Sequence, residues 1–183
     1  MKKALLLIVS LFCIQAALAY ETVIVKFPPN QGWHADFYQH EGVEAILQYV
    51  PVGENAQNWN RTVIFHAYKN VNWTSSTARF MDKMTMQMEN KNSSGLYKYL
   101  KYTENDSIAV RCVTKNAYIP TQCEIYRVSK SFEGLISMHY INKNVQDYKA
   151  TFDMWYQIMK DVLIYQSYYR EDRIMDKATS FEL

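Results

Sequence analysis

The sequence predicts a single α+β domain built on one antiparallel sheet of about six or seven strands and covered by two main helices. The first observation is the order of the patterns: strand-like runs, a helical stripe, more strand-like runs and a second helical stripe. The second is that the strand-helix alternation typical of a parallel sheet is absent. The third is that no repeat, linker or low-complexity stretch divides the chain, so one core is expected.

The first residues have the pattern of a bacterial secretory signal peptide. Paired lysines precede an apolar run over residues 4–14, and a small-x-small motif follows at residues 17–19. A retained membrane anchor is the alternative, but the apolar run is shorter than the ~20 residues that a membrane span needs. We therefore expect a signal peptide at residues 1–19, export to the periplasm or the cell exterior, and a mature domain over residues 20–183.

The net charge argues against one class of partner. The chain has 20 Lys and Arg against 18 Asp and Glu, and two of the lysines belong to the signal peptide. The expected mature chain is therefore neutral, with 18 residues of each sign (20 minus 2 against 18). A neutral protein has no overall attraction for nucleic acid or for an anionic membrane surface.

The cysteines predict one disulfide. Cys13 leaves with the signal peptide, which leaves Cys112 and Cys123 in an oxidising compartment. Strand-like runs flank both residues, so the bond is expected to join the two strands of a hairpin. The alternative, a redox-active or metal-binding pair, needs closer spacing such as C-x-x-C.

The first strand-like run, Thr22 to Phe27, ends at a pair of prolines. Residues 30–42, with the sequence NQGWHADFYQHEG, are expected to form a loop or a short helical turn. Residues 44–50 and 61–68 then alternate as strands and are expected to pair antiparallel. Their connection, residues 51–60, is expected to be an ordered surface loop pinned by Trp59.

A helix is expected next, beginning near Thr74 to Ser76, whose hydroxyl groups can cap it. Its apolar stripe contains Phe80, Met81, Met84 and Met88, and a core role is favoured over a cofactor site. Four strand-like runs follow and are expected to form an antiparallel meander. They cover residues 96–102, 107–113, 123–129 and 134–141.

The last long element is a helix with Asn144 as its cap and Asp147 in its first turn. Apolar residues recur every three or four positions, at Tyr148, Phe152, Trp155, Met159 and Val162. The helix is expected to run to about Gln166. Alternatively, its end breaks into a last strand, because β-branched and aromatic residues crowd residues 162–169. The charged tail, residues 170–183, is expected to be frayed.

Three stretches carry a resemblance: YVPVGE at residues 49–54, NW at 58–59, and FEGLISMHYINKN at 132–144. Together they resemble small, largely uncharacterised exported proteins of Gram-negative bacteria. The resemblance implies export and an α+β domain, without implying an activity. Some of those proteins are substrates of secretion systems, so release from the cell is also an expectation. The arrangement of elements resembles the sandwich-like α+β folds of the Mog1 and PsbP type, which is an analogy of fold alone.

One functional hypothesis is a small secreted, metal-assisted hydrolase. It rests on the cluster of His34, Asp36, His40 and Glu41, with His66 as a third metal ligand if its strand passes below. The spacing matches no zinc motif, and the sequence has no nucleophile elbow, Walker loop or S-x-x-K motif. Exposed or hydrogen-bonded histidines are therefore the favoured interpretation, and no cofactor is expected.

The other hypothesis is an exported non-catalytic binding or accessory protein, of which a secreted factor is one form. Its partner would be a protein or a glycan, contacted through aromatic side chains in loops. The candidates are Trp33, Phe37, Tyr38, Trp59 and Trp73. Fifteen tyrosines and nine methionines accompany them, and these can mark a binding face or simply fill the core. This hypothesis is favoured because the sequence lacks a catalytic motif.

Overall fold

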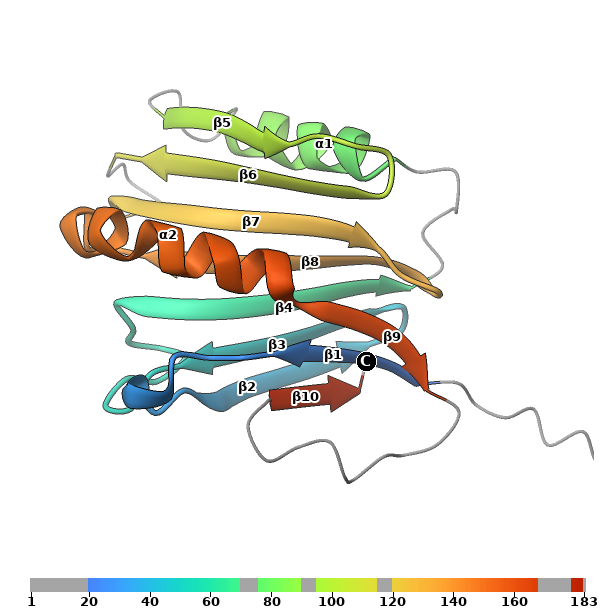
Figure 1. Cartoon of the computed structure of the whole chain (residues 1–183), viewed down its shortest axis with the longest axis horizontal. Helices are drawn as coiled ribbons and strands as arrows, with labels where there is room; N and C mark the ends of the chain where they lie inside the picture. Colours follow the sequence, from blue (N-terminus) through green and yellow to red (C-terminus); the bar gives the residue numbers. More distant parts are fainter. Residues whose placement is uncertain (1–19, 70–75, 90–94, 115–119, 168–178, 183) are drawn as a thin grey trace, which may run out of the picture.

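The computed structural model describes residues 20–69, 76–89, 95–114, 120–167 and 179–182, and they form an α+β domain (Figure 1). Its main layer is a seven-stranded antiparallel sheet, which confirms the predicted fold class. In spatial order the strands are β2 (His34–Glu41), β3 (Glu44–Val50), β4 (Arg61–Lys69), β8 (Gly134–Asn142), β7 (Gln122–Lys130), β6 (Asp106–Val113) and β5 (Gly95–Lys101). The predicted central pair is β3 and β4, and the predicted meander is β5 to β8.

A second, three-stranded sheet was not expected. It has β1 (Tyr20–Val25) in the centre, between β9 (Leu163–Ser167) and β10 (Thr179–Glu182). The predicted continuation of the last helix to Gln166 is wrong, because the helix ends at Asp161 and the alternative, a last strand, is present as β9. The predicted fraying of the tail is wrong for β10, which pairs with β1. The rest of the tail lies outside the described residues, as does the predicted signal peptide.

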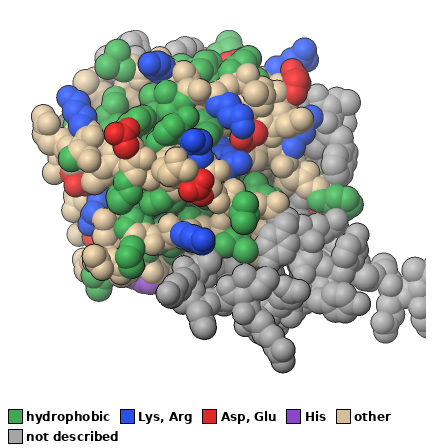
Figure 2. All heavy atoms as spheres, in the orientation of Figure 1, with side chains coloured by type: hydrophobic (Ala, Val, Ile, Leu, Met, Phe, Trp, Pro, Cys, Tyr) green, Lys and Arg blue, Asp and Glu red, His purple; other side chains and the backbone are tan. Residues whose placement is uncertain are grey.

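Helices α1 (Thr77–Glu89) and α2 (Val145–Asp161) cover opposite faces of the large sheet (Figure 1). Successive residues of a strand point to opposite faces. Tyr126 of β7 accordingly packs with Met81 of α1, whereas its neighbour Ile125 belongs to the core under α2. On the face that Figure 2 shows, acidic and basic side chains are interspersed with hydrophobic ones.

The main core lies under α2 and is rich in aromatic rings. Trp155 is fully buried and stacks on Tyr140 of β8, with ring centroids 3.9 Å apart. Trp33 meets the edge of Trp155 at 5.1 Å and stacks on Phe27 at 5.3 Å. Burial of such large rings supplies much of the hydrophobic stabilisation of a domain. The abundant aromatic residues therefore fill the core at these positions.

Both ends of α2 are fixed by side chains. The Asn144 side chain accepts hydrogen bonds from the backbone N–H groups of Gln146 and Asp147, both at 3.1 Å, which confirms the predicted cap. At the other end, the Arg127 guanidinium donates to the carbonyl oxygens of Met159 at 2.7 Å and Val162 at 3.1 Å. The positive charge of Arg127 also interacts favourably with the negative end of the α2 dipole.

The start of α1 differs from the expectation. Its Ser76 hydroxyl is buried and has no hydrogen-bond partner among the described residues, so it does not cap the helix. The Thr77 hydroxyl instead donates to the Thr103 carbonyl oxygen at 2.8 Å. This bond ties α1 to the turn between β5 and β6. Thr74 lies outside the described residues.

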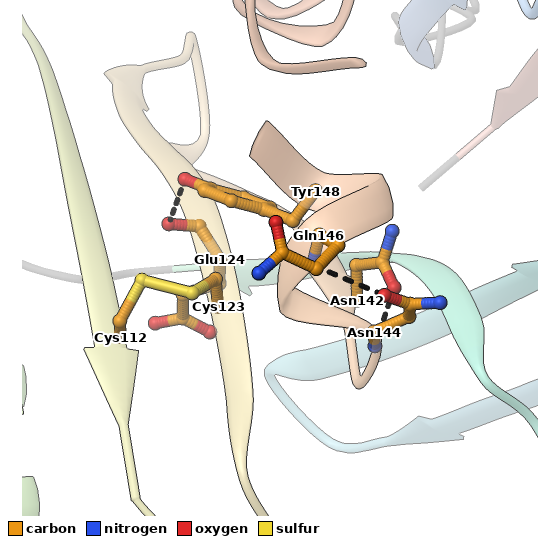
Figure 3. The surroundings of a disulfide bond; sticks show 7 residues. All are labelled: Cys112, Cys123, Glu124, Asn142, Asn144, Gln146 and Tyr148. Carbon is orange, nitrogen blue, oxygen red and sulfur yellow. Dashed lines mark hydrogen bonds between the residues drawn. A yellow bond between two sulfur atoms is a disulfide. The ribbon is translucent and has the colours of Figure 1, made fainter. Parts of the chain in front are cut away.

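The predicted disulfide between Cys112 and Cys123 is present, and it joins directly opposite residues of β6 and β7. Figure 3 shows it between β6 and β7, beside the first turn of α2. On the opposite side of β7, Cys123 is the strand-pairing partner of Asn142 in β8. The Tyr148 hydroxyl of α2 donates to the Glu124 carbonyl oxygen at 3.1 Å (Figure 3). The disulfide therefore lies where β7, β8 and α2 meet.

The expectation of a loop or a short helical turn at residues 30–42 is met only at the start of this stretch and is wrong for residues 34–41, which form a strand. A short 3-10 helix (Pro29–Gln31) is followed by β2, which pairs with β3 through a tight turn. Gly42 in this turn has a φ of 58°, which glycine adopts with little strain. All eight residues of β2 are exposed, so the strand has no buried face and lacks the apolar alternation that marks a strand in a sequence.

Candidate functional site

A polar pocket of about 480 Å³ lies at one end of the large sheet. It is lined by Glu54, Asn60, Arg61, Asn142, Asn144 and Asp147. Antiparallel pairing of β4 with β8 places Arg61 opposite Asn142, and α2 begins immediately after β8. The pocket therefore combines the loop between β3 and β4, the start of β4, the end of β8 and the first turn of α2.

Asn142 forms the fixed part of this pocket. Its side chain is fully buried and donates to the Tyr140 hydroxyl at 3.0 Å and to the Asp147 carboxylate at 2.6 Å. Its amide oxygen accepts the backbone N–H of Asn144 at 2.8 Å. Because both ends of the amide are occupied, the orientation of this side chain is set before any ligand arrives.

The charged residues on the opposite side are also held in place. The Glu54 carboxylate accepts the backbone N–H groups of Asn60 at 2.5 Å and Arg61 at 3.0 Å through one of its oxygen atoms. The Arg61 guanidinium donates to the Gln31 amide oxygen at 3.2 Å. Its second terminal nitrogen and the other Glu54 oxygen can still bind a ligand.

The pocket carries charges of both signs. Glu54 and Asp147 are acidic, Arg61 is basic, and Lys143 lies close by. The Lys143 ammonium group lies 3.7 Å from the centroid of the Trp59 ring and donates to the Trp59 carbonyl oxygen at 2.6 Å. Burial lowers the pKa of Lys143, and the Glu54 charge offsets part of this effect. With two carboxylates present, the site does not favour a phosphate or another multiply charged anion.

The structure does not bring the predicted aromatic residues together. Trp33 packs in the core, and Trp59 lies beside the pocket with Lys143 over its ring. Phe37 and Tyr38 are exposed, but they are consecutive residues of β2 and point to opposite faces. Trp73 lies outside the described residues. The four described residues therefore do not form one continuous aromatic surface.

The candidate metal ligands are also dispersed. His34 and His40 stand at opposite ends of β2, and the His34 imidazole lies 4.0 Å from the Asp36 carboxylate. His66 pairs with Glu44 at 3.1 Å instead. Glu41, the remaining candidate, accepts a hydrogen bond from Gln39 at 2.9 Å. In the described ranges no three His, Cys, Asp or Glu side chains are grouped as a metal site. The convergence that the hydrolase hypothesis requires is not found.

The structure reveals one cluster that the sequence did not indicate. The Ser137 hydroxyl lies 3.0 Å from Nε2 of His139, whose Nδ1 lies 3.8 Å from the Glu124 carboxylate. Glu124 is buried and also pairs with Arg111. Burial alone would raise the pKa of Glu124, but the hydrogen bond with His139 and the charge of Arg111 outweigh it, so the pKa lies below its usual value.

Serine, histidine and carboxylate are in the same order here as in a hydrolase triad. Their position in the fold, however, points to a structural role. Ser137 is fully buried in the middle of β8, and it shares a hydrogen bond with the Tyr68 hydroxyl. A substrate carbonyl cannot reach an oxygen atom in this position. The cluster instead satisfies polar groups on the sheet face that α1 partly covers. A serine two residues from a histidine is too common to predict such an arrangement.

Fold and pocket together define a small, disulfide-bonded α+β protein with a preorganised polar site at one end of its sheet. Comparisons with protein-family models, with curated proteins and with solved structures found no match. Within the described ranges, neither helix has the length and apolar character needed to cross a membrane.

Proposed function

We propose that this chain is an exported, non-catalytic binding protein and that the polar pocket between β4, β8 and α2 binds a glycan. The observation that carries the proposal is the pocket itself, whose polar groups are fixed by hydrogen bonds within the chain. Preorganised groups bind more tightly because little entropy is lost when the ligand arrives. A volume of about 480 Å³ lies in the range of small-molecule sites.

The chemistry of the lining supports a neutral, hydroxyl-rich ligand. Each sugar hydroxyl donates one hydrogen bond and accepts others. The guanidinium of Arg61 and the amide of Asn144 supply donors, while Glu54 and Asp147 supply acceptors. The balance of charges disfavours an anion, and hydrogen bonds to charged groups are stronger than bonds between neutral groups.

The binding half of the proposal is tested by calorimetric titration with a panel of neutral oligosaccharides. Arg61→Gln and Asp147→Asn should each weaken binding about 10-fold to 100-fold, because each change replaces a charged hydrogen-bonding group. Arg79→Gln, on the exposed surface of α1, is the matched control and should bind like the wild type. Failure of every oligosaccharide to bind, or equal weakening by the control, would contradict the glycan site.

The export half rests on the signal-peptide pattern and on the resemblance to exported Gram-negative proteins, and the disulfide is compatible with it. Expression of the full chain in a Gram-negative host should place the protein in the periplasm or the medium. Intact-mass measurement should then show a chain that begins at Tyr20. Protein found in the cytoplasm with Met1 retained would contradict export. The ratio of periplasmic to released protein tests whether it acts as a secreted factor.

A further inference from the structure

Gln31 does not line the polar pocket, yet it is bonded to one of the residues that do. It is half-buried at the end of the 3-10 helix, and its amide oxygen accepts a hydrogen bond from the Arg61 guanidinium at 3.2 Å. The two residues are 30 positions apart in the sequence. Because Gln31 is not part of the lining, any effect that it has on a ligand must act through Arg61.

The Gln31 side chain is itself fixed before any ligand arrives. The Trp33 indole N–H donates to the same amide oxygen at 3.1 Å. The backbone carbonyl oxygen of Gln31 accepts the N–H of Val52 at 3.2 Å, and Val52 belongs to the loop that carries Glu54 of the pocket. An amide nitrogen cannot accept a hydrogen bond, so the two donors that converge here identify the oxygen and set the orientation of the amide.

Trp33 rests on the aromatic core that also supports the opposite side of the pocket. Its ring meets the edge of Trp155, which stacks on Tyr140. The Tyr140 hydroxyl accepts a hydrogen bond from the Asn142 amide, and Asn142 lies opposite Arg61 in the pairing of β8 with β4. Closely packed rings have little freedom to shift. One group of rings therefore sets the position of both sides of the pocket.

The partner of Arg61 is a neutral amide and not a carboxylate. The bond therefore orients the guanidinium without neutralising its charge, and the charge strengthens the hydrogen bonds that Arg61 can still donate. A long side chain that is free to rotate loses that freedom when it binds a ligand, which weakens binding. A bond that orients the side chain beforehand reduces this loss.

We propose that Gln31 is a positioning residue, which holds the Arg61 guanidinium in the orientation that the ligand meets. Its support is Trp33, with the rings of the core behind it, and the backbone bond to Val52. The order of Arg61 in the free protein follows from these contacts alone. The consequence for affinity rests on the proposed glycan site, so the two are tested separately.

The order of Arg61 is tested on the purified protein without a ligand. Nitrogen relaxation of its Nε–H group measures motion on the picosecond to nanosecond scale. Gln31→Met keeps the length of the side chain but removes the acceptor, so the Arg61 group should become more mobile. Gln31→Glu keeps an acceptor oxygen and should restore the order of the wild type. A group that stays ordered in Gln31→Met, or an order that Gln31→Glu does not restore, would overturn the proposal.

Two controls separate positioning from loss of the fold. The Nε–H of Arg127, which donates to the Asp106 carboxylate at 2.6 Å, should stay ordered in every variant. Gln157→Met makes the same change on the exposed surface of α2, where it removes a side-chain hydrogen bond of 2.8 Å, and should leave Arg61 ordered. Loss of order at Arg127 in Gln31→Met would show a general loosening of the fold and would contradict the positioning role.

The effect on binding is tested by calorimetric titration with the neutral oligosaccharide that the wild type binds most tightly. Gln31→Met should weaken binding about 3-fold to 10-fold, because the ligand must then order one long side chain. In the Arg61→Gln background the same change should have no further effect, since the residue on which it acts is gone.

The two ideas fail in different ways. Unchanged affinity in Gln31→Met, or an equal loss with and without Arg61, would overturn the positioning role while the glycan site stands. A wild type that binds no oligosaccharide, with Arg61 still ordered by Gln31, would contradict the glycan site and support the positioning role.

Discussion

At the scale of single residues, Arg127 makes more separate interactions than its place in the middle of β7 suggests. Its guanidinium binds the Asp106 carboxylate at 2.6 Å and also reaches the last carbonyl groups of α2. Burial would raise the pKa of Asp106, but hydrogen bonds from Arg127, Lys101 and Ser129 outweigh it and lower the pKa. One side chain therefore joins the end of α2 to the sheet below it.

Replacement of Arg127 should show this contribution. Arg127→Gln should lower the free energy of unfolding by about 2 kcal/mol, because it removes charged hydrogen bonds and the cation at the end of α2. Urea unfolding followed by circular dichroism measures the change. Arg79→Gln is the control and should alter stability by less than about 0.5 kcal/mol. An equal loss in both variants would argue against the role of Arg127.

His66 should make stability depend on pH. Burial lowers its pKa below the ordinary value, although Glu44 offsets part of the shift. Above about pH 6.5 His66 is neutral in both the folded and the unfolded chain, so its protonation does not reduce the stability of the fold there. As the pH falls below that value the unfolded chain takes up the proton first, and stability is lost until the folded state is protonated too.

Urea midpoints measured between pH 7 and pH 5 test this pKa shift. They should fall more steeply for the wild type than for His66→Gln, which cannot take up the proton. His40→Gln, at an exposed position of β2, should retain the wild-type slope. If His66→Gln also retains the wild-type slope, His66 does not have a lowered pKa in the folded state.

At the scale of elements, β6 and β7 are linked twice, by their strand pairing and by the disulfide. Double replacement, Cys112→Ala with Cys123→Ala, should cost about 3 kcal/mol by the chain-entropy estimate. At about 2–4 °C per kcal/mol the melting temperature should fall by several degrees. Scanning calorimetry measures it, and an unchanged melting temperature would show that the bond contributes nothing to stability.

The close approach of β8 to β4 depends on Gly134. A Cβ atom at this position would lie 2.0 Å from the carbonyl oxygen of Tyr68, so the two strands would have to separate. Gly134→Ala should therefore cost about 3 kcal/mol. Gly42→Ala meets no neighbouring atom and should cost only the ~1–2 kcal/mol of its positive φ. Thermal unfolding of the two variants compares these costs, and the reverse order would contradict the argument.

The elements that the sequence predicts correctly are those that pack at least one face against a core. β3, β4 and α2 pack one face against a core, and β7 and β8 in the meander are buried on both faces, so all of them carry runs of apolar residues. β2 has no buried face, so its sequence is not distinguishable from that of a loop. The pocket could not be predicted either. Glu54 and Asp147 are far apart in sequence, and only the pairing of β4 with β8 brings their segments together.

At the scale of the whole molecule, stability should be graded across the large sheet. β3, β4, β8, β7 and β6 each have a strand on both sides, with β4, β8 and β7 at the centre, whereas β2 and β5 have a strand on one side. Amide hydrogen exchange should therefore be slowest in the three central strands, β4, β8 and β7, and fastest in the exposed edge strand β2. Uniform protection across the sheet would contradict this gradient.

The small sheet joins the two ends of the described chain. β1 pairs with β9 along one side and with β10 along the other, so its partners are synthesised last. A chain threaded through a membrane channel amino end first would hold β1 without neighbours until residues 163–182 had emerged. During that interval Val23 and Val25, which are buried in the finished fold, would face water. In the exported chain that we propose, this layer would therefore be completed only at the end of translocation.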